Sequence, residues 1–453
     1  MFMTDQYLIG NEAGKRIFEE IRSLPIADVH NHADVKALAE NRNYDDVWQL
    51  FGATDHYVWE MMRKCNVPEK LITGDASAHD KFVALCSIMP DVAGNPCYEW
   101  LHLDLRLYLE CDLLMNEENA EAIWEHANAL LATEEFRPLA LLERMNVEVM
   151  CSTDAPWDLL QEHAEVNRMV GRTLVRPTWR PDALMKIAAP NWNGCVDRLA
   201  HRFSMEIKTF DKFLEGLELS HDYFAANGAI ASDHGLETVP VVTEKGMAES
   251  LFNRARAGGK ISAADAMLFA GFFLHKCAEL DIKNRFVMQL HAGAVRDVRS
   301  RLFREIGPDS GGDVCNLTQD QLPGLVSLLD AFDPWLKTVL YSLDPAQQPT
   351  MASIARAFGA NCRMGSAWWL CDSPIGMKRQ LEYIGSVDCL SAFAGMVSDS
   401  RKLLSYGSRF EMFRRVLSDV LGNMVEYGQI PEDVAIRLAR KMSYDGPKAF
   451  YGV

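Results

Sequence analysis

Short apolar runs that end in polar residues recur along the chain and constrain its fold more than any other feature. Runs of this length between helical segments are typical of buried parallel strands. Eight such runs lie at residues 25–29, 147–156, 173–182, 228–235, 285–293, 337–345, 361–369 and 391–401. Their spacing predicts an α/β fold, a (β/α)8 TIM barrel. A doubly wound sheet is the alternative, but no glycine-rich phosphate turn follows the first run.

The polar residues at the ends of these runs form one predicted group. In a (β/α)8 barrel, the carboxyl ends of all strands surround the mouth that carries the active site. The residues placed there are His30, His32, Ser152, Thr153, Asp154, Arg180, Asp233, His234, His291, Ser342, Asp344, Trp368, Trp369, Asp399 and Arg401. We therefore expect their side chains to converge on a single site.

The connection between the first two runs is too long for one crossover. It contains helical patterns at residues 44–51, 55–65 and 118–136, and in the last of these Ala120, Ile123, Ala127 and Leu130 share one face. We predict a catalytic barrel domain of residues 1–35 and 147–453. Residues 36–146 would form a helical subdomain, inserted after the first strand and able to lean over the mouth.

His30 and His32 end the first run with one residue between them. In an extended segment both imidazoles point to the same side, and the last strand of a barrel brings Asp399 beside them. An isolated His-x-His pair is more often structural, but this placement favours a divalent metal site, with Zn²⁺ the preferred ion. Binuclear hydrolases of this architecture bridge two ions with a lysine, generally after the fourth strand. Residues 228–235 contain none, so we predict one metal.

Arg180 and Arg401 follow the third and eighth runs. Guanidinium groups bind carboxylates through paired hydrogen bonds, so we predict an acidic small-molecule substrate, although surface salt bridges are the usual role of arginine. The net charge of −17 argues against nucleic acid or an acidic membrane as partner. Asp233, His234 and His291 are candidates for binding sugar hydroxyls or for proton transfer.

Other candidates lie in loops and at a helix start. His56 and Tyr57 begin a predicted inserted helix, where capping or packing is the alternative role. Trp368 and Trp369 could stack on a sugar ring or pack at the barrel end. The segment "IGPDSGGDV" at 306–314 has the glycine and proline content of a rigid loop, and we interpret it as structural.

The composition also bears on location. The first residues lack the basic start and apolar core of a signal peptide, and the apolar stretch at 266–274 is shorter than the roughly 20 residues of a membrane span. Eleven scattered cysteines form no Cys-x-x-Cys pair, which is typical of reduced thiols. We expect a cytoplasmic protein.

Ten segments in the same order carry a family resemblance from about residue 6 to the C-terminus. They are "IADVHNH", "TDHYVWEMMRK", "GNPCYEW", "CSTDAPWD", "RPTWRPD", "ASDHG", "MQLHAGAVR", "GPDSGGD", "GSAWWL" and "AGMVSDSRKLLSY". Together they resemble the uronate isomerase (glucuronate isomerase) family of the amidohydrolase superfamily.

The resemblance implies a (β/α)8 barrel that interconverts D-glucuronate with D-fructuronate and D-galacturonate with D-tagaturonate. It implies His30, His32 and Asp399 as metal ligands. The matching substrate-contacting and catalytic positions are His56, Tyr57, Arg180, Asp233, His291, Trp368 and Arg401. A homo-oligomer is expected for an enzyme of this type.

Four positions depart from the family pattern. Asn31 stands where many members have cysteine, Ala155 stands where a second aspartate is usual, and Gly407 and Phe410 interrupt the run after the last strand. None of these changes removes a proposed ligand or acid–base group. They leave room for a divergent subgroup with a shifted substrate preference.

The hypothesis that follows is an aldose–ketose isomerase that moves a proton from C2 to C1 through a cis-enediol. Arg401 and Arg180 would hold the substrate carboxylate, and Asp399 and Tyr57 would be the acid–base pair, with His56 beside them. A metal-bound aspartate is a weaker base, so the division of roles stays open. The alternatives are a mononuclear metal-dependent hydrolase, such as a sugar-acid lactonase, and a silent sugar-acid binding protein.

Overall fold

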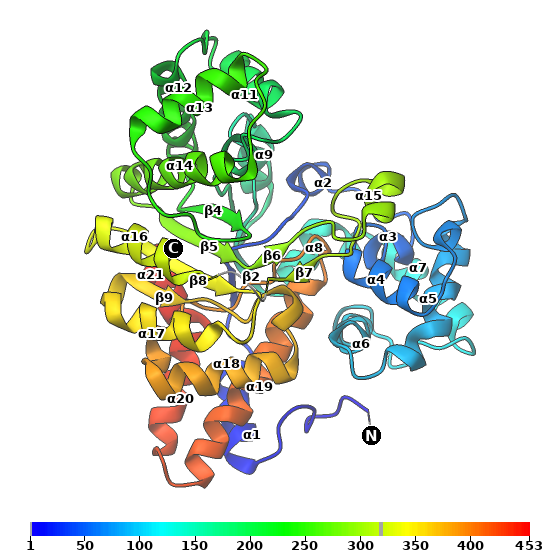
Figure 1. Ribbon diagram of the computed structural model, residues 1–453. Helices are drawn as coiled ribbons and strands as arrows, with labels where there is room; N and C mark the ends of the chain where they lie inside the picture. The colour runs from blue at the N-terminus through cyan, green and yellow to red at the C-terminus, as the bar shows by residue number, and fades with distance from the viewer. Residues whose placement is uncertain (1, 317–319) are drawn as a thin grey trace.

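The computed structural model describes residues 2–316 and 320–453 and shows parallel strands surrounded by helices (Figure 1). One parallel sheet has the order β1 (Ile26–Asp28), β2 (Val147–Cys151), β3 (Leu174–Arg176). The second has the order β4 (Ala231–Leu236), β5 (Val287–Ala292), β8 (Lys337–Ser342), β9 (Cys362–Met364). An antiparallel pair, β6 (Ala294–Val295) and β7 (Val314–Cys315), extends from the end of β5. The predicted α/β class is confirmed.

Trp179 connects the two parallel sheets. Its backbone forms a parallel bridge with Asp154 on one side and with Ser232 on the other. Its indole Nε1 donates to Ser220 Oγ at 2.9 Å, which ties this point to helix α12 (Phe210–Ala226). The side chain is fully buried, so the junction lies in the core.

The segment 394–400 lies between β9 and β1 without forming a regular strand. Ala394 N donates to Met364 O at 2.9 Å, and Asp399 N donates to His30 O at 3.2 Å. Positive φ angles of 108° at Gly395 and 49° at Asp399 interrupt the extended backbone. The prediction of a strand over 391–401 was therefore wrong, although the segment occupies the predicted place.

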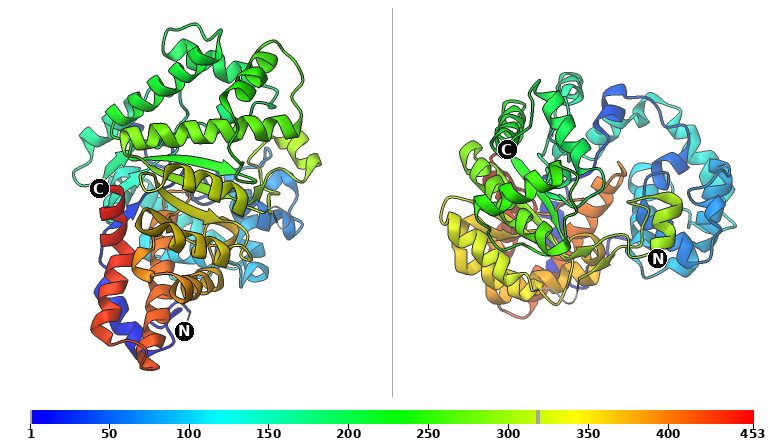
Figure 2. Two further views of the ribbon diagram at one scale, coloured as in Figure 1. Left: turned by 60° about the vertical axis from the view of Figure 1, so that its left-hand side comes forward. Right: turned by 45° about the horizontal axis from the view of Figure 1, so that its top comes forward.

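Seven helices lie between β1 and β2. They are α2 (Val35–Glu40), α3 (Val47–Phe51), α4 (His56–Lys64), α5 (Ala78–Val92), α6 (Pro96–Tyr108), α7 (Ala120–Leu131) and α8 (Pro138–Arg144). The predicted helices at 44–51, 55–65 and 118–136 correspond to α3, α4 and α7. Helices α3–α7 gather to one side of the strands, where the blue and cyan ribbons form a separate group (Figures 1 and 2).

Most of the remaining helices surround the sheets, and one of them, Ser300–Ile306, lies beside α3 and α4 (Figure 1). They are α1 (Glu12–Ile21), α9 (Gln161–Met169), α10 (Asp182–Met185), α11 (Trp192–Arg202), α12, α13 (Lys245–Arg256), α14 (Ala263–Asn284), α15 (Ser300–Ile306), α16 (Leu322–Phe332), α17 (Gln348–Phe358), α18 (Pro374–Val387), α19 (Ser405–Glu426), α20 (Glu432–Arg440) and α21 (Gly446–Tyr451). Helix α1 packs so closely on α19 that a Cβ atom added to Gly422 would lie 2.4 Å from the backbone nitrogen of Gly14. No helix in the described part of the chain has the length and apolar character of a membrane span.

Candidate active site

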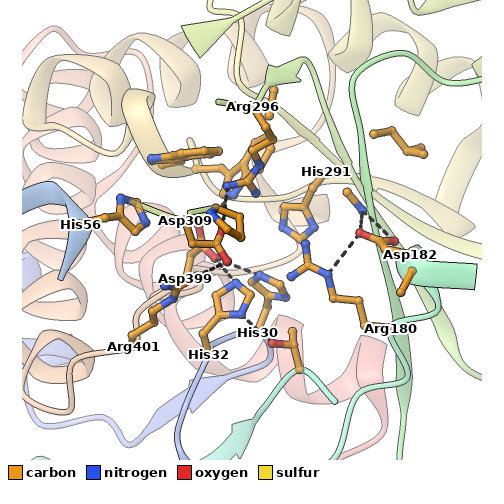
Figure 3. A pocket seen from close by; sticks show the side chains of 18 of the residues that line it. His30, His32, His56, Arg180, Asp182, His291, Arg296, Asp309, Asp399 and Arg401 are labelled. Carbon is orange, nitrogen blue, oxygen red and sulfur yellow. Dashed lines mark hydrogen bonds and ion pairs between the residues drawn. The ribbon is translucent and has the colours of Figure 1, made fainter. Parts of the chain in front are cut away.

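A cavity of about 780 Å³ opens at the carboxyl ends of the parallel strands (Figure 3). Most of the predicted site residues line it: His30, His32, His56, Tyr57, Arg180, His291, Trp368, Asp399 and Arg401. Several strand-end residues do not: Ser152, His234, Ser342 and Asp344. The predicted convergence on one mouth therefore describes most, but not all, of the strand ends.

His30, His32 and Asp399 form a compact cluster at one end of the cavity. The Nε2 atoms of both histidines lie 3.1 Å from Asp399 Oδ1. Ligand atoms at Zn–N and Zn–O distances near 2.0–2.2 Å in a tetrahedral site lie about 3.3 Å apart. The three atoms therefore fit the ligand set of one divalent ion, with the cavity side open.

Contacts behind this cluster fix the orientation of its members. Thr153 Oγ1 lies 2.6 Å from His32 Nδ1, and Trp368 Nε1 donates to Asp399 Oδ2 at 2.9 Å. Such contacts orient metal ligands and select the histidine tautomer. Burial lowers the pKa of His32 to about 4. Its imidazole is therefore neutral at pH 7, which is the form that binds metals.

Asp233 lies beneath the cavity floor rather than on its surface. It is fully buried, and its Oδ1 lies 2.6 Å from His291 Nδ1, while Arg180 Nε lies 3.2 Å from its Oδ2. Arg180 Nε is also 3.3 Å from Asp182 Oδ2. Burial opposes ionisation, but Arg180 and the neighbouring imidazoles hold the pKa of Asp233 well below its usual value. Asp233 is thus an anionic anchor for residues that reach the cavity.

A second group of metal-ligand type overlaps the first. His30, Asp233 and His291 also offer atoms within 4.8 Å of one another. The guanidinium of Arg180 already supplies a positive charge to Asp233. A second cation here would lie beside that charge, which disfavours metal binding at this second group.

His56 and Tyr57 enter the cavity from the start of α4. Asp55 caps this helix, because its Oδ1 accepts from Tyr57 N at 2.9 Å. The two rings stack with centroids 4.6 Å apart. The guanidinium of Arg409, a buried residue of α19, lies 4.9 Å from the Tyr57 ring centroid. Burial raises the pKa of Tyr57 well above 10, so its phenol is protonated at neutral pH.

The cavity is also lined by two residues that sequence analysis missed, Arg296 and Asp309. Arg401 Nη2 lies 3.2 Å from Asp309 Oδ2, and Arg296 Nη1 lies 3.8 Å from Asp309 Oδ1 (Figure 3). Arg296 also lies over Trp369, at 4.3 Å from the ring centroid. Sequence analysis interpreted residues 306–314 as structural, and Asp309 of this segment lines the cavity. The available signal was its position in a loop that follows a predicted strand.

Comparisons with known proteins identify the family of the chain. A family model described as glucuronate isomerase matches residues 1–451. The chain is 44% identical to the uronate isomerase of Thermotoga maritima over 452 residues, with 100% of each protein covered. A crystal structure of uronate isomerase from Thermotoga maritima matches with a TM-score of 0.97, also over 100% of both chains. A glucuronate isomerase from Caulobacter crescentus is 27% identical and matches with a TM-score of 0.94, covering 100% of this chain and 97% of that chain.

The resemblance of the ten sequence segments is thereby confirmed over the full length of the chain. The chain belongs to the glucuronate isomerase family.

Proposed function

We propose that this enzyme is an aldose–ketose isomerase of hexuronates, converting D-glucuronate to D-fructuronate and D-galacturonate to D-tagaturonate. The observation that carries this proposal is one cavity that joins the His30–His32–Asp399 cluster to arginine side chains. A sugar acid has hydroxyl and carbonyl oxygens that can bind at the histidine–aspartate cluster, and a carboxylate that can bind to the arginines. Family membership supports isomerisation over the lactonase alternative.

The proton transfer is assigned to Asp399 and Tyr57. At neutral pH a carboxylate is ionised and a phenol is protonated. Asp399 therefore accepts the C2 proton while Tyr57 protonates O1 to give the enediol. Asp399 then returns a proton to C1 while Tyr57 takes up the proton of the C2 hydroxyl, which restores both residues. Trp368 holds the Asp399 carboxylate through its indole N–H. His56, stacked on Tyr57, contacts a substrate hydroxyl. His291 binds another, and Asp233 acts through His291 and Arg180.

One divalent metal, with zinc the preferred ion, belongs to this proposal. His30, His32 and Asp399 would hold it, and when bound it supplies electrostatic polarisation of the substrate oxygens. The contact of Thr153 with His32 and the hydrogen bond from Trp368 to Asp399 support this ligand set.

Metal analysis tests this stoichiometry. Purified protein, saturated with Zn²⁺ and then dialysed, is expected to retain one equivalent per chain, because Arg180 already pairs with the carboxylate of the overlapping group. His32→Ala should lose that equivalent, since it removes one of three ligands. His79→Ala is the matched control, because His79 lies on the exposed surface beside Glu121. Retention of two equivalents would contradict the single site.

Arg180 is proposed to hold the substrate carboxylate through its terminal nitrogens, together with Arg401. Arg180→Met is expected to lower kcat/KM for D-glucuronate roughly 100-fold, because charge-assisted hydrogen bonds are lost. Arg180→Lys should retain only part of the wild-type kcat/KM, since lysine cannot form the paired hydrogen bonds of a guanidinium group. Steady-state kinetics with D-glucuronate and with its uncharged amide give the comparison. If the variant loses the same factor on both, Arg180 does not bind the carboxylate.

The barrel and the domain division are also proposed here. The bridges of Trp179 and the hydrogen bonds of residues 394–399 to β9 and β1 support a closed (β/α)8 arrangement of the strand regions. Residues 1–35 and 147–453 would form this barrel, and residues 36–146 the inserted helical subdomain. A cytoplasmic location is supported by the eleven cysteines, none of which forms a disulfide. Homo-oligomeric assembly stays a prediction.

Turnover itself is tested with the purified, zinc-loaded enzyme. Proton NMR is expected to show ketose resonances from D-glucuronate or D-galacturonate and none from D-glucose, which lacks the carboxylate. A folded, metal-loaded protein that converts neither uronate would contradict the proposal. Product formation from a sugar-acid lactone alone would establish the lactonase alternative.

A further inference from the structure

The chain between β6 and β7 links the strand ends to the inserted helices. Residues 294–315, here termed the clasp, contain α15, which lies beside α3 and α4 in Figure 1. Gly312 N donates to Glu60 Oε1 on α4 at 2.7 Å, and Arg63 of α4 donates to the backbone oxygen of Ser310. Gly311 and Gly312 have φ angles of 88° and 95°, which glycine adopts without strain. The clasp is thus fastened to α4 just after residue 309.

Asp309 is the clasp residue that reaches the arginines of the cavity. Its carboxylate lies 3.2 Å from Arg401 and 3.8 Å from Arg296. In the described part of the chain, no other carboxylate lies within 4.0 Å of the Arg401 guanidinium nitrogens. The Asp309 side chain is 53% exposed, so it does not serve the packing of a core. Its contacts are with groups that face the substrate cavity.

Arg401 needs such a partner because of its position in the chain. It stands two residues after Asp399, and a long flexible side chain samples many rotamers unless something holds it. An arginine free to turn back toward Asp399 would neutralise the carboxylate that the isomerisation uses. A fixed arginine spares the ordering cost when substrate binds.

We propose that Asp309 is a positioning residue of the isomerisation. It holds Arg401, and more weakly Arg296, in the orientation that receives the substrate and keeps Arg401 away from Asp399. The inference rests on the proposed function and adds a residue outside the strand ends to its machinery. The competing idea is that Asp309 occupies the place of the substrate carboxylate and must leave. The two hydrogen bonds that fasten the clasp to α4 favour a fixed position.

Asp309→Asn tests this with almost no change of shape. We expect kcat/KM for D-glucuronate to fall on the order of 10- to 100-fold, since misplaced substrate-binding groups cost about this much. The melting temperature should stay within about 2 °C of wild type, because the pair is half exposed. Glu305→Gln is the matched control. It removes a charge from the same clasp, where Glu305 pairs with Arg301 on the surface, and should leave kcat/KM unchanged.

A double-mutant cycle separates positioning from a structural role. In an Arg401→Met background, Asp309→Asn should change kcat/KM by less than about twofold, because its effect passes through Arg401. If Asp309→Asn merely destabilised the clasp, kcat/KM would fall by the same factor in the wild-type and the Arg401→Met backgrounds. Asp309→Glu, which keeps the charge, should recover a large part of the activity.

Failure of this inference differs from failure of the proposed function. Wild-type enzyme without uronate turnover would contradict the function itself. Active wild type, with an Asp309→Asn variant that is equally active or binds D-glucuronate more tightly by calorimetry, would overturn the positioning role. An equal loss in the two backgrounds of the cycle would overturn it as well.

Discussion

Asp399→Asn is expected to lower kcat for D-glucuronate by roughly 10²- to 10⁴-fold, the range for loss of a positioned acid–base group. Asparagine cannot accept the C2 proton, and it is a weaker metal ligand than a carboxylate. The Asp399 carboxylate contacts His30, His32 and Trp368, so the change acts at the centre of the site. Steady-state kinetics with the zinc-loaded variant give the measurement.

A control variant makes the Asp399 result specific. Asp344→Asn is the matched control, since Asp344 closely follows strand β8 but does not line the cavity, and should keep kcat within about threefold of wild type. A variant Asp399→Asn that keeps more than a tenth of the wild-type kcat would remove Asp399 from the acid–base role. Turnover by the wild-type protein would also exclude the alternative of a sugar-acid binding protein without catalytic activity.

Lys402→Met is expected to lower the free energy of unfolding by about 3–5 kcal/mol, the usual cost of leaving buried charges without their partner. Lys402 is almost completely buried, with its Nζ 3.1 Å from Asp104 Oδ2 and 3.6 Å from Asp55 Oδ2. Asp104 belongs to α6, and Asp55 caps the helix that carries His56 and Tyr57. This cluster fixes the inserted helices to the segment after Asp399.

The Lys402 effect should depend on pH with a definite sign. Burial raises the pKa of Asp104 in the folded state, and Lys402 is the main group that opposes this. A folded-state pKa above the unfolded one makes stability fall as pH rises through the folded-state value. Removing Lys402 raises that pKa further, so the variant should lose more stability at pH 8 than at pH 5.

Urea unfolding at the two pH values measures this difference. Lys378→Met is the control, because Lys378 pairs with Asp419 at 3.0 Å but is 43% exposed, and it should cost less than about 1 kcal/mol. Adding Asp104→Asn to Lys402→Met should recover part of the loss, since one unpaired carboxylate is removed. An equal loss for the Lys402 and Lys378 variants would show that the buried cluster does not stabilise the fold.

The strands and the metal-type cluster were predictable because local sequence determines them. Apolar runs must be buried, and polar residues at their ends fall at the same edge of parallel strands. His30 and His32 follow from this rule alone. The irregular backbone of the segment before Asp399 could not be predicted by this rule, because the positive φ angles of Gly395 and Asp399 depend on the packing around them. An apolar run does not reveal such a break.

Residues outside the strand ends could not be found by the same rule. Asp309 reaches Arg401 only because the clasp is fastened to α4, which lies far away in the sequence. Lys402 likewise acquires its role from carboxylates on inserted helices. Asp233 was predicted to contact substrate, but its side chain turns inward to His291 and Arg180 and is fully buried. Position along a strand does not determine which contacts a side chain makes in three dimensions.

Isomerisation in deuterated buffer tests the central claim most directly. The enzyme is incubated with D-glucuronate in D₂O, and product and recovered substrate are examined by proton NMR. Proton transfer through an enediol predicts deuterium at C1 of the ketose and at C2 of the recovered aldose, because the abstracted proton exchanges with solvent. Complete conversion to a ketose free of deuterium, with none at C2 of the recovered aldose, would show that the C2 hydrogen reaches C1 without exchange. It would contradict release of this proton to an Asp399 that exchanges with solvent.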